Sequence, residues 1–375
     1  MKKLLTYLLI ITLALLTSII NPNKAGESDF QLTELPLPKS PQQVILESMT
    51  AQQKVGQLFM FGFYGPQLTE EMNELITEEH IGSILLLKYN IENDTQLRNL
   101  ITEIQSLSDI PLLISIDQEG GIVSRLTDNE ILTKPQSQIE NNLDAYNTAY
   151  ERGKILKELG INTNLAPVVE YITEKNSFLY PRVFTGDIQQ VSEKSLSMIQ
   201  GYTDARIISV PKHYPGHSNY SIDSHLTLPE VNITDEQWNE YISPFKYILE
   251  SPDTKAIMVG HISYPNIDSE PSTLSYEILT VRLREKLKYK GVVITDDMEM
   301  GALKNEGEYA QLAKKALLAG NDILLYSGIP EVQQEVYNYI LQEVEQGNID
   351  IKIVDEKVLR ILELKLNTIY QNNPS

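Results

Sequence analysis

The sequence predicts a single (β/α)8 barrel of the TIM type, and three observations support this prediction. Eight short apolar segments recur along the chain and are separated by stretches of helical pattern. These segments do not alternate with polar residues, which is typical of parallel strands buried on both faces. The chain has 375 residues, of which 42% are hydrophobic, and barrels of this class often reach such a length as one domain.

The expected strands are short runs rich in Leu, Ile and Val. In chain order they span residues 58–61, 81–87, 111–116, 161–169, 205–210, 256–259, 291–295 and 322–326. Eight such strands, each separated from the next by a helix, favour a closed barrel over an open sheet.

The expected helices begin with a helix or turn at residues 48–54. They continue at residues 69–80, 94–108, 142–159, 191–204, 235–250, 275–287, 309–318, 332–346 and 354–366. Thr69 should cap its helix, because its hydroxyl can accept a hydrogen bond from the first turn. Pro244 should break or kink the helix at 235–250, because proline lacks the amide hydrogen that a helix interior needs.

The N-terminal segment has the pattern of a secretory signal. Lys2 and Lys3 precede an uncharged, Leu- and Ile-rich run at residues 4–20, which matches a basic head and an apolar body. We expect export with cleavage near Ala25. An uncleaved membrane anchor is the alternative, since the run is nearly long enough to span a bilayer. The expected organisation is therefore a signal or anchor at 1–25, a proline-containing linker at 26–45 and the barrel at 46–375.

Composition excludes several classes of function. The net charge of −20 argues against binding to nucleic acid and to anionic lipid surfaces. The chain has no cysteine, which excludes disulfides, thiolate catalysis and a lipid-modified N-terminal cysteine.

Polar residues with catalytic potential follow the predicted strands. They are Asp117 after the third strand, a histidine-rich loop at 212–225 after the fifth, His261 after the sixth and Asp296 after the seventh. The C-terminal ends of barrel strands are where active sites are built. Carboxylates, cations and amphoteric donors gathered there suit a polyhydroxylated ligand, and Asp296 could be a nucleophile, a base or the partner of a cation.

The histidine loop packs three of the five histidines into fourteen residues. Pro215 and Gly216 rule out a regular helix across its centre. Asp223 and His225 are two residues apart, so the carboxylate can bond one imidazole nitrogen, fix its tautomer and raise its basicity. Two other interpretations stay open: a loop of solvated polar groups, and a zinc site, which would need three ligands and an open position.

Three motifs in this order resemble glycoside hydrolase family 3, in its β-N-acetylglucosaminidase branch. The first is IDQEGG at residues 116–121 followed by Arg125, and the second is KHYPGH at 212–217 with DSH at 223–225. The third is VITDDM at 293–298, followed by MGA at 300–302. The similarity runs from about residue 49 to residue 370.

The resemblance implies a role for each motif residue. Asp296 would be the nucleophile that forms a glycosyl-enzyme, and His225, paired with Asp223, would be the general acid and then the base. The residues that would hold the terminal N-acetylglucosamine are Asp117, Arg125, Arg182, Lys212 and His213. A histidine suits the acid role because its ordinary pKa of about 6.5 lies near neutrality. Neither a metal nor an organic cofactor is required.

The sequence departs from the family pattern at three places. Ser218 replaces a usual glycine in the histidine loop, Glu170 stands where an aspartate is common, and the segment around Arg182 only approximates its motif. The chain stops after the barrel, as in the one-domain members of the family.

The predicted function is that of an exported, retaining exo-β-N-acetylglucosaminidase acting on peptidoglycan or chitin-type fragments. Its expected partner is an amino-sugar oligosaccharide and not nucleic acid, and a monomer is favoured. The first alternative is a phosphorylase with the same residues, because a histidine in place of a glutamate would not repel phosphate. The second is a non-catalytic sugar-binding wall protein.

Overall fold

The computed structural model describes residues 39–219 and 223–369, and it confirms the predicted barrel. Eight parallel strands form one sheet in the order β5-β4-β3-β2-β1-β8-β7-β6. They are β1 (Phe59–Gly62), β2 (Ser83–Leu86), β3 (Leu113–Ile116), β4 (Thr163–Asn164), β5 (Ile208–Ser209), β6 (Ala256–Val259), β7 (Val292–Asp297) and β8 (Ile323–Tyr326). Each lies on a predicted strand segment.

The barrel closes through the chain that follows β5. The Met258 N–H donates to the Pro211 carbonyl at 2.9 Å, and the Tyr214 N–H donates to the Met258 carbonyl at 2.8 Å. On the other side, the Lys212 N–H donates to Pro167 at 2.9 Å and the Val169 N–H donates to Lys212 at 2.7 Å. The first residues of the histidine loop are therefore held between their two neighbours in the manner of a strand.

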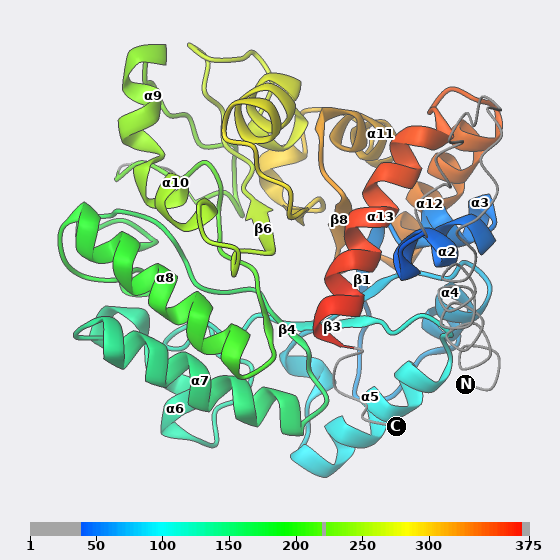
Figure 1. Ribbon diagram of the computed structural model, residues 1–375, viewed down its shortest axis with the longest axis horizontal. Coiled ribbons are helices and arrows are strands. Elements are labelled where there is room, and N and C mark those ends of the chain that lie inside the picture. Colours follow the sequence, from blue (N-terminus) through cyan, green and yellow to red (C-terminus); the bar gives the residue numbers. More distant parts are fainter. Residues whose placement is uncertain (1–38, 220–222, 370–375) are drawn as a thin grey trace, which may run out of the picture. The chain divides into compact units, whose positions relative to one another are not determined.

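Helices surround the strands (Figure 1). The longer ones are α4 (Glu70–Thr77), α5 (Asp94–Ser106), α7 (Asn142–Glu158), α8 (Ile188–Asp204), α11 (Tyr309–Ala319), α12 (Pro330–Glu345) and α13 (Ile351–Thr368), with the π-helix η5 (Glu277–Lys286) between β6 and β7. Shorter helices include α3 (Ala51–Gly56), α6 (Glu130–Thr133) and the 3₁₀ turn η3 (Tyr180–Arg182). The apolar side chains of the strands are almost completely buried, as expected for a sheet that helices cover.

Two local predictions concern helix ends, and both are confirmed. The Thr69 hydroxyl accepts a hydrogen bond from the Met72 N–H and caps α4. The predicted 235–250 helix is divided into α9 (Asp235–Tyr241) and α10 (Ser243–Leu249), with Pro244 in the first turn of the second. Proline fits there because the first turn has no intrahelical partner for its amide.

The predicted linker is wrong at its C-terminal end. Helix α2 (Pro41–Ser48) occupies residues that were expected to be extended, and it packs against α13. Pro41 begins the helix instead of preventing it, and Ser40 and Gln43 form a capping box around the first turn. The rest of the linker and the signal or anchor segment lie outside the described residues. Within the described ranges, no helix is long and apolar enough to cross a bilayer.

Lys365 of α13 is a fully buried cation that pairs only with neutral groups in the described part of the chain. Its Nζ donates to Gln57 Oε1 at 2.7 Å and to the Gly82 carbonyl at 2.8 Å. Burial lowers the pKa of Lys365 to about 7.

This burial predicts a stability that rises with pH. The lysine pKa is about 10.4 in the unfolded chain, so the unfolded chain binds more protons than the folded chain between about pH 7 and 10. The free energy of unfolding therefore rises with pH across that window. Relative to Lys365→Met, the free energy of unfolding should rise by at most about 1.4 kcal/mol per pH unit. Urea unfolding of both proteins across the window measures this, and parallel pH profiles would contradict it.

Candidate active site

The C-terminal end of the barrel holds a network of two carboxylates and three cations. Lys212 Nζ lies 2.5 Å from Asp117 Oδ1 and 2.7 Å from Glu119 Oε1. Arg182 binds both oxygens of Glu119, through Nε at 2.9 Å and Nη2 at 2.8 Å. Arg125 Nη2 lies 3.2 Å from Asp117 Oδ2. The loops after β3, β4 and β5 thus contribute charges to one cluster.

Pairing keeps this network ionised although it is buried. Burial alone would raise the pKa of Glu119, but Lys212 and Arg182 hold it well below its ordinary value. Burial alone would lower the pKa of Lys212, but Asp117 and Glu119 raise it above its ordinary value. Removing one partner would leave an uncompensated buried charge, which typically costs about 3–5 kcal/mol. The positions of the remaining donors are therefore fixed before a ligand enters.

Asp296 lies near the end of β7, which runs two residues further than predicted. Its Oδ1 accepts the Asp297 N–H at 2.9 Å, and its Oδ2 lies 4.0 Å from His213 Nε2. Burial alone would raise the pKa of Asp296, but His213, His261, the Asp297 N–H and Lys212 together hold it below its ordinary value. An ionised carboxylate that is still 17% exposed can act as a nucleophile.

Asp297 and His261 support this strand end. The Asp297 carboxylate accepts the Glu299 N–H at 3.1 Å and binds Ser327, and burial raises its pKa to about 6. His261 Nε2 lies 3.0 Å from the Asp297 carbonyl oxygen, and its Nδ1 lies 2.7 Å from Thr273 Oγ1. Both ring nitrogens of His261 are thus engaged, so this histidine positions the strand.

Glu170, in the segment after β4, joins both histidines of the KHYPGH motif. Its Oε1 lies 3.0 Å from His213 Nδ1 and 2.9 Å from His217 Nδ1, and its Oε2 accepts the His217 N–H at 2.6 Å. Burial alone would raise the pKa of Glu170, but the two histidines lower it to about 2. An ionised carboxylate only accepts, so each Nδ1 carries a proton, and the Nε2 of His213 faces Asp296.

The same three residues are a possible metal site. Their ligand atoms lie within 4.8 Å of one another and all three side chains are buried. One carboxylate and two imidazoles are a set that zinc accepts. A metal ion bound through these atoms would have to displace both Nδ1 protons, so it would compete with the hydrogen bonds that now orient the rings.

Asp223 and His225 form a hydrogen-bonded pair in the outer part of the histidine loop. His225 Nδ1 lies 2.7 Å from Asp223 Oδ1, and the His225 N–H donates to the same oxygen at 3.0 Å. Burial raises the pKa of Asp223, but these bonds from His225 lower it below its ordinary value. The His225 side chain is 62% exposed, and within the described ranges no hydrogen bond or ion pair links the dyad to Asp296.

The dyad is nevertheless tied to the strand that carries Asp296. The Ala302 N–H donates to the Ser224 carbonyl at 3.2 Å. A Cβ on Gly301 would lie 2.6 Å from the His225 carbonyl oxygen, so only glycine allows this close approach. The segment after β7 therefore supports the end of the loop that carries the acid/base candidate.

The predicted site residues fall into two groups. Asp117, Arg125, Arg182, Lys212, His213 and Asp296 lie in one cluster, whereas Asp223 and His225 lie in a more exposed part of the histidine loop. Their catalytic and binding roles stay predictions. The sequence did not give Glu119 or Glu170 a place among the site residues. A signal was present, because Glu170 directly follows a predicted strand and Glu119 lies two residues after Asp117.

Comparison with known proteins identifies the relatives of this chain. Residues 50–364 match the model of the glycosyl hydrolase family 3 N-terminal domain. A β-hexosaminidase of Nitrosomonas eutropha is 30% identical over 288 residues, covering 74% of this chain and 82% of that protein. A β-hexosaminidase A of Pseudoalteromonas piscicida is 31% identical, and there the match covers 69% of this chain but only 48% of the relative.

Solved structures give the same grouping. A family 3 β-N-acetylglucosaminidase from Paenibacillus superimposes with a TM-score of 0.82 at 33% identity, covering 88% of this chain and 64% of the other. A β-N-acetylglucosaminidase from Thermotoga maritima gives a TM-score of 0.72 at 27% identity, covering 83% and 67%. The chain thus spans only part of several of these longer relatives.

The position of Glu170 predicts a tautomer that can be measured. In the wild type, both His213 and His217 should carry their proton on Nδ1. In Glu170→Gln the amide has one acceptor oxygen. If that oxygen takes the place of Oε1, the NH2 group faces the His217 N–H, and if it takes the place of Oε2, the NH2 group faces both Nδ1–H groups, so the buried mismatch should cost about 1–3 kcal/mol of stability. Nitrogen NMR of the imidazoles and thermal unfolding test this. Glu170→Asp, which keeps the carboxylate, is the control. A neutral ring that carries its proton on Nε2 in the wild type, or a Glu170→Gln protein as stable as the wild type, would contradict the assignment.

Proposed function

The chain belongs to glycosyl hydrolase family 3, and from this premise we propose that it is a retaining exo-β-N-acetylglucosaminidase. The main support is the position of Asp296, an ionised and partly exposed carboxylate beside a preorganised cluster of charges. The names of the relatives support the sugar, since several are β-hexosaminidases or β-N-acetylglucosaminidases.

In the first chemical step, Asp296 attacks the anomeric carbon as the glycosidic bond breaks. His225 gives a proton to the departing oxygen, and a glycosyl-enzyme remains on Asp296. In the second step, His225 removes a proton from water, water attacks the same carbon, and Asp296 leaves. The bond from His225 Nδ1 to Asp223 directs Nε2 away from the carboxylate, so Nε2 is the nitrogen that exchanges protons.

The buried cluster would hold the non-reducing sugar. Asp117, Arg125, Arg182, Lys212 and His213 present acceptors and donors that are already held by one another. Hydroxyl groups of a terminal sugar can bond to these groups without first ordering them, which reduces the entropic cost of binding. A site of this kind favours substrates that form hydrogen bonds with all of its polar groups. It disfavours substrates that leave some of these groups without a partner.

A phosphorylase is the second candidate. The proposed acid/base favours it, because His225 does not repel phosphate as a glutamate in that role would. The products distinguish the two reactions, since a phosphorylase releases N-acetylglucosamine 1-phosphate and a hydrolase releases the free sugar.

Placement and natural substrate follow from the N-terminal pattern. We infer that the barrel acts outside the cytoplasm, either secreted or tethered by residues 1–25, on peptidoglycan or chitin-type fragments. The basic pair and apolar run at the N-terminus support this inference.

The proposed sugar specificity predicts a strong preference for N-acetylglucosaminides over glucosides. The acetamido group would contribute hydrogen bonds that the glucoside leaves unmade, and such losses are worth about 10- to 100-fold or more. Comparing kcat/KM for the two aryl glycosides in phosphate-free buffer measures the preference. Equal or higher activity on the glucoside would refute the assignment.

The two catalytic roles can be separated by leaving group. Asp296→Ala should abolish turnover of every substrate, since no glycosyl-enzyme can form. His225→Ala should still release dinitrophenolate, which departs without a proton, but should lose about 10²–10⁴-fold on an alkyl glycoside. Because the second step then lacks its base, glycosyl-enzyme should accumulate and dinitrophenol should appear in a burst.

Asp223→Asn serves as the matched variant for this experiment. It perturbs the imidazole without removing it, so it should resemble a milder His225→Ala. If His225→Ala lost both substrates equally and gave no burst, His225 would not be the acid/base.

A further inference from the structure

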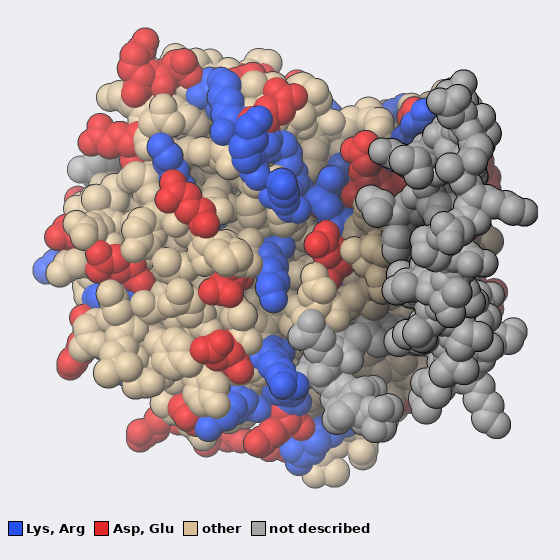
Figure 2. Space-filling view, in the orientation of Figure 1, with Lys and Arg blue, Asp and Glu red and all other residues tan. Residues whose placement is uncertain are grey.

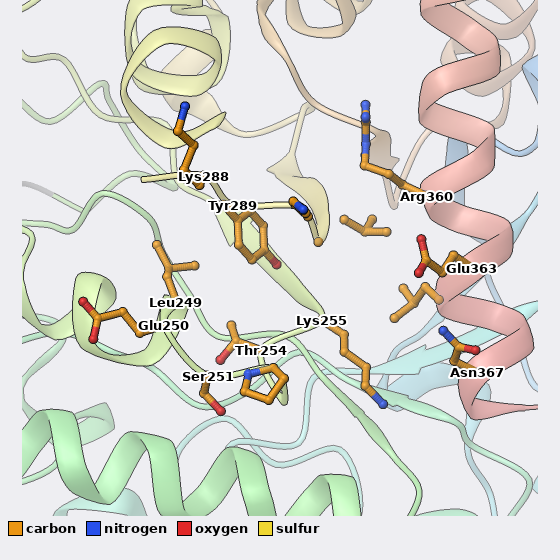
Figure 3. Close-up of a pocket in the computed structure, with 15 residues that line it drawn as sticks. Leu249, Glu250, Ser251, Thr254, Lys255, Lys288, Tyr289, Arg360, Glu363 and Asn367 are labelled. Atoms are coloured by element: carbon orange, nitrogen blue, oxygen red, sulfur yellow. The ribbon is translucent and has the colours of Figure 1, made fainter. Parts of the chain in front are cut away.

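A second hollow lies at the opposite end of the barrel from the candidate active site. It has a volume of about 460 Å³ and is lined by the segments that lead into β6 and β7 together with the C-terminal half of α13. Figure 3 shows its side chains arranged around one opening, with Lys255, Lys288 and Arg360 on different sides of it. This volume is within the range of sites that bind small molecules.

The charge of this hollow is opposite to that of the chain. Its lining includes four cations, Lys255, Lys288, Lys290 and Arg360, against two carboxylates, Glu250 and Glu363. The whole chain, in contrast, carries 51 acidic and 31 basic residues. Figure 2, which has the orientation of Figure 1, shows Lys and Arg side chains gathered in a band down the middle of the molecule's visible face.

The three lysines are not paired within the described residues. No carboxylate oxygen there lies within 4.0 Å of Lys255, Lys288 or Lys290, although ion pairs form close by. Arg284 and Arg360 both bind the buried Asp322, at 2.6 and 2.8 Å. Basic residues that stabilise the fold at this end of the barrel would be expected to have carboxylate partners of this kind. The three lysines have none among the described residues.

Two further features mark the loop between η5 and β7. Tyr289 is 5% exposed, and its hydroxyl has no hydrogen-bond partner among the described residues. The hydroxyl is buried against Gly291, where a Cβ would lie 2.3 Å from it. Lys288 has a φ of 58°, a left-handed conformation that glycine adopts more easily. A lysine there places a charge at the opening at the expense of backbone strain.

We propose that this hollow binds a phosphate-type oxyanion. Lysine ammonium groups bind phosphate as point charges. Several cations around one opening suit an anion with more than one charged oxygen. This site is independent of the glycosidase function proposed above. Free phosphate and the phosphate of a lipid headgroup share this chemistry.

The test is calorimetric titration with inorganic phosphate at constant ionic strength. Saturating N-acetylglucosamine is present throughout to occupy the sugar site proposed above, and phosphate binding that the pocket variants leave unchanged would belong to the candidate active site. The variant Lys288→Gly removes one charge and also relieves the strain of the left-handed backbone at this position. The double variant Lys255→Gln with Lys290→Gln removes the other two lysine charges. Each pocket variant should weaken phosphate binding by roughly tenfold or more, since each lost charged hydrogen bond is worth about that factor.

The matched control is the double variant Lys304→Gln with Lys352→Gln, two exposed lysines outside the lining. It should bind phosphate like the wild type, and thermal unfolding should show all variants folded. A second arm uses phosphatidylcholine vesicles with and without phosphatidylglycerol. Pocket-dependent vesicle binding would identify a headgroup, and phosphate binding alone would identify the free ion. The proposal is overturned if neither probe binds, or if the pocket and control variants bind equally.

Discussion

The backbone hydrogen bonds of residues 211–214 are the constraint on which the rest of the structure depends. Pro211 and Tyr214 bond to β6, and Lys212 bonds to the segment after β4, so these few residues close the barrel. The same bonds fix the two side chains between them. Lys212 reaches Asp117 and Glu119, while His213 lies between Glu170 and Asp296. Barrel closure and site assembly are therefore one structural event.

Buried charge explains how the cluster keeps its shape without a ligand. Glu119, Lys212 and Arg182 are nearly inaccessible to water, and each would be unstable there alone. Because they compensate one another, their donors point in fixed directions, and the low local dielectric strengthens each bond. The dyad of Asp223 and His225 is different: it is more exposed, and the His225 carbonyl lies close to Gly301, as would suit the mobile acid/base that we propose it to be.

Much of the site could be predicted from the sequence, and what could not be predicted has a common cause. Asp117, Lys212, His213 and Asp296 follow apolar strands, so their common end of the barrel could be inferred. The role of Glu170 could not, because its importance lies in contacts with His213 and His217, more than forty residues away in the chain. It could not be predicted either that no bond joins the dyad to Asp296 in the described chain, since this depends on contacts between distant segments.

The sequence by itself determined the strand and helix order, because apolar periodicity and turn residues act over a few neighbours. It also determined the dyad of Asp223 and His225, whose spacing of two residues makes the bond local. Tertiary structure alone decided the helix at Pro41, which is stabilised by packing against α13. It also decided which cations form ion pairs. Arg360 of α13 binds Asp322, whereas Lys255 and Lys290 bind no carboxylate in the described chain. Pairing depends on contacts between distant segments, and local sequence does not specify them.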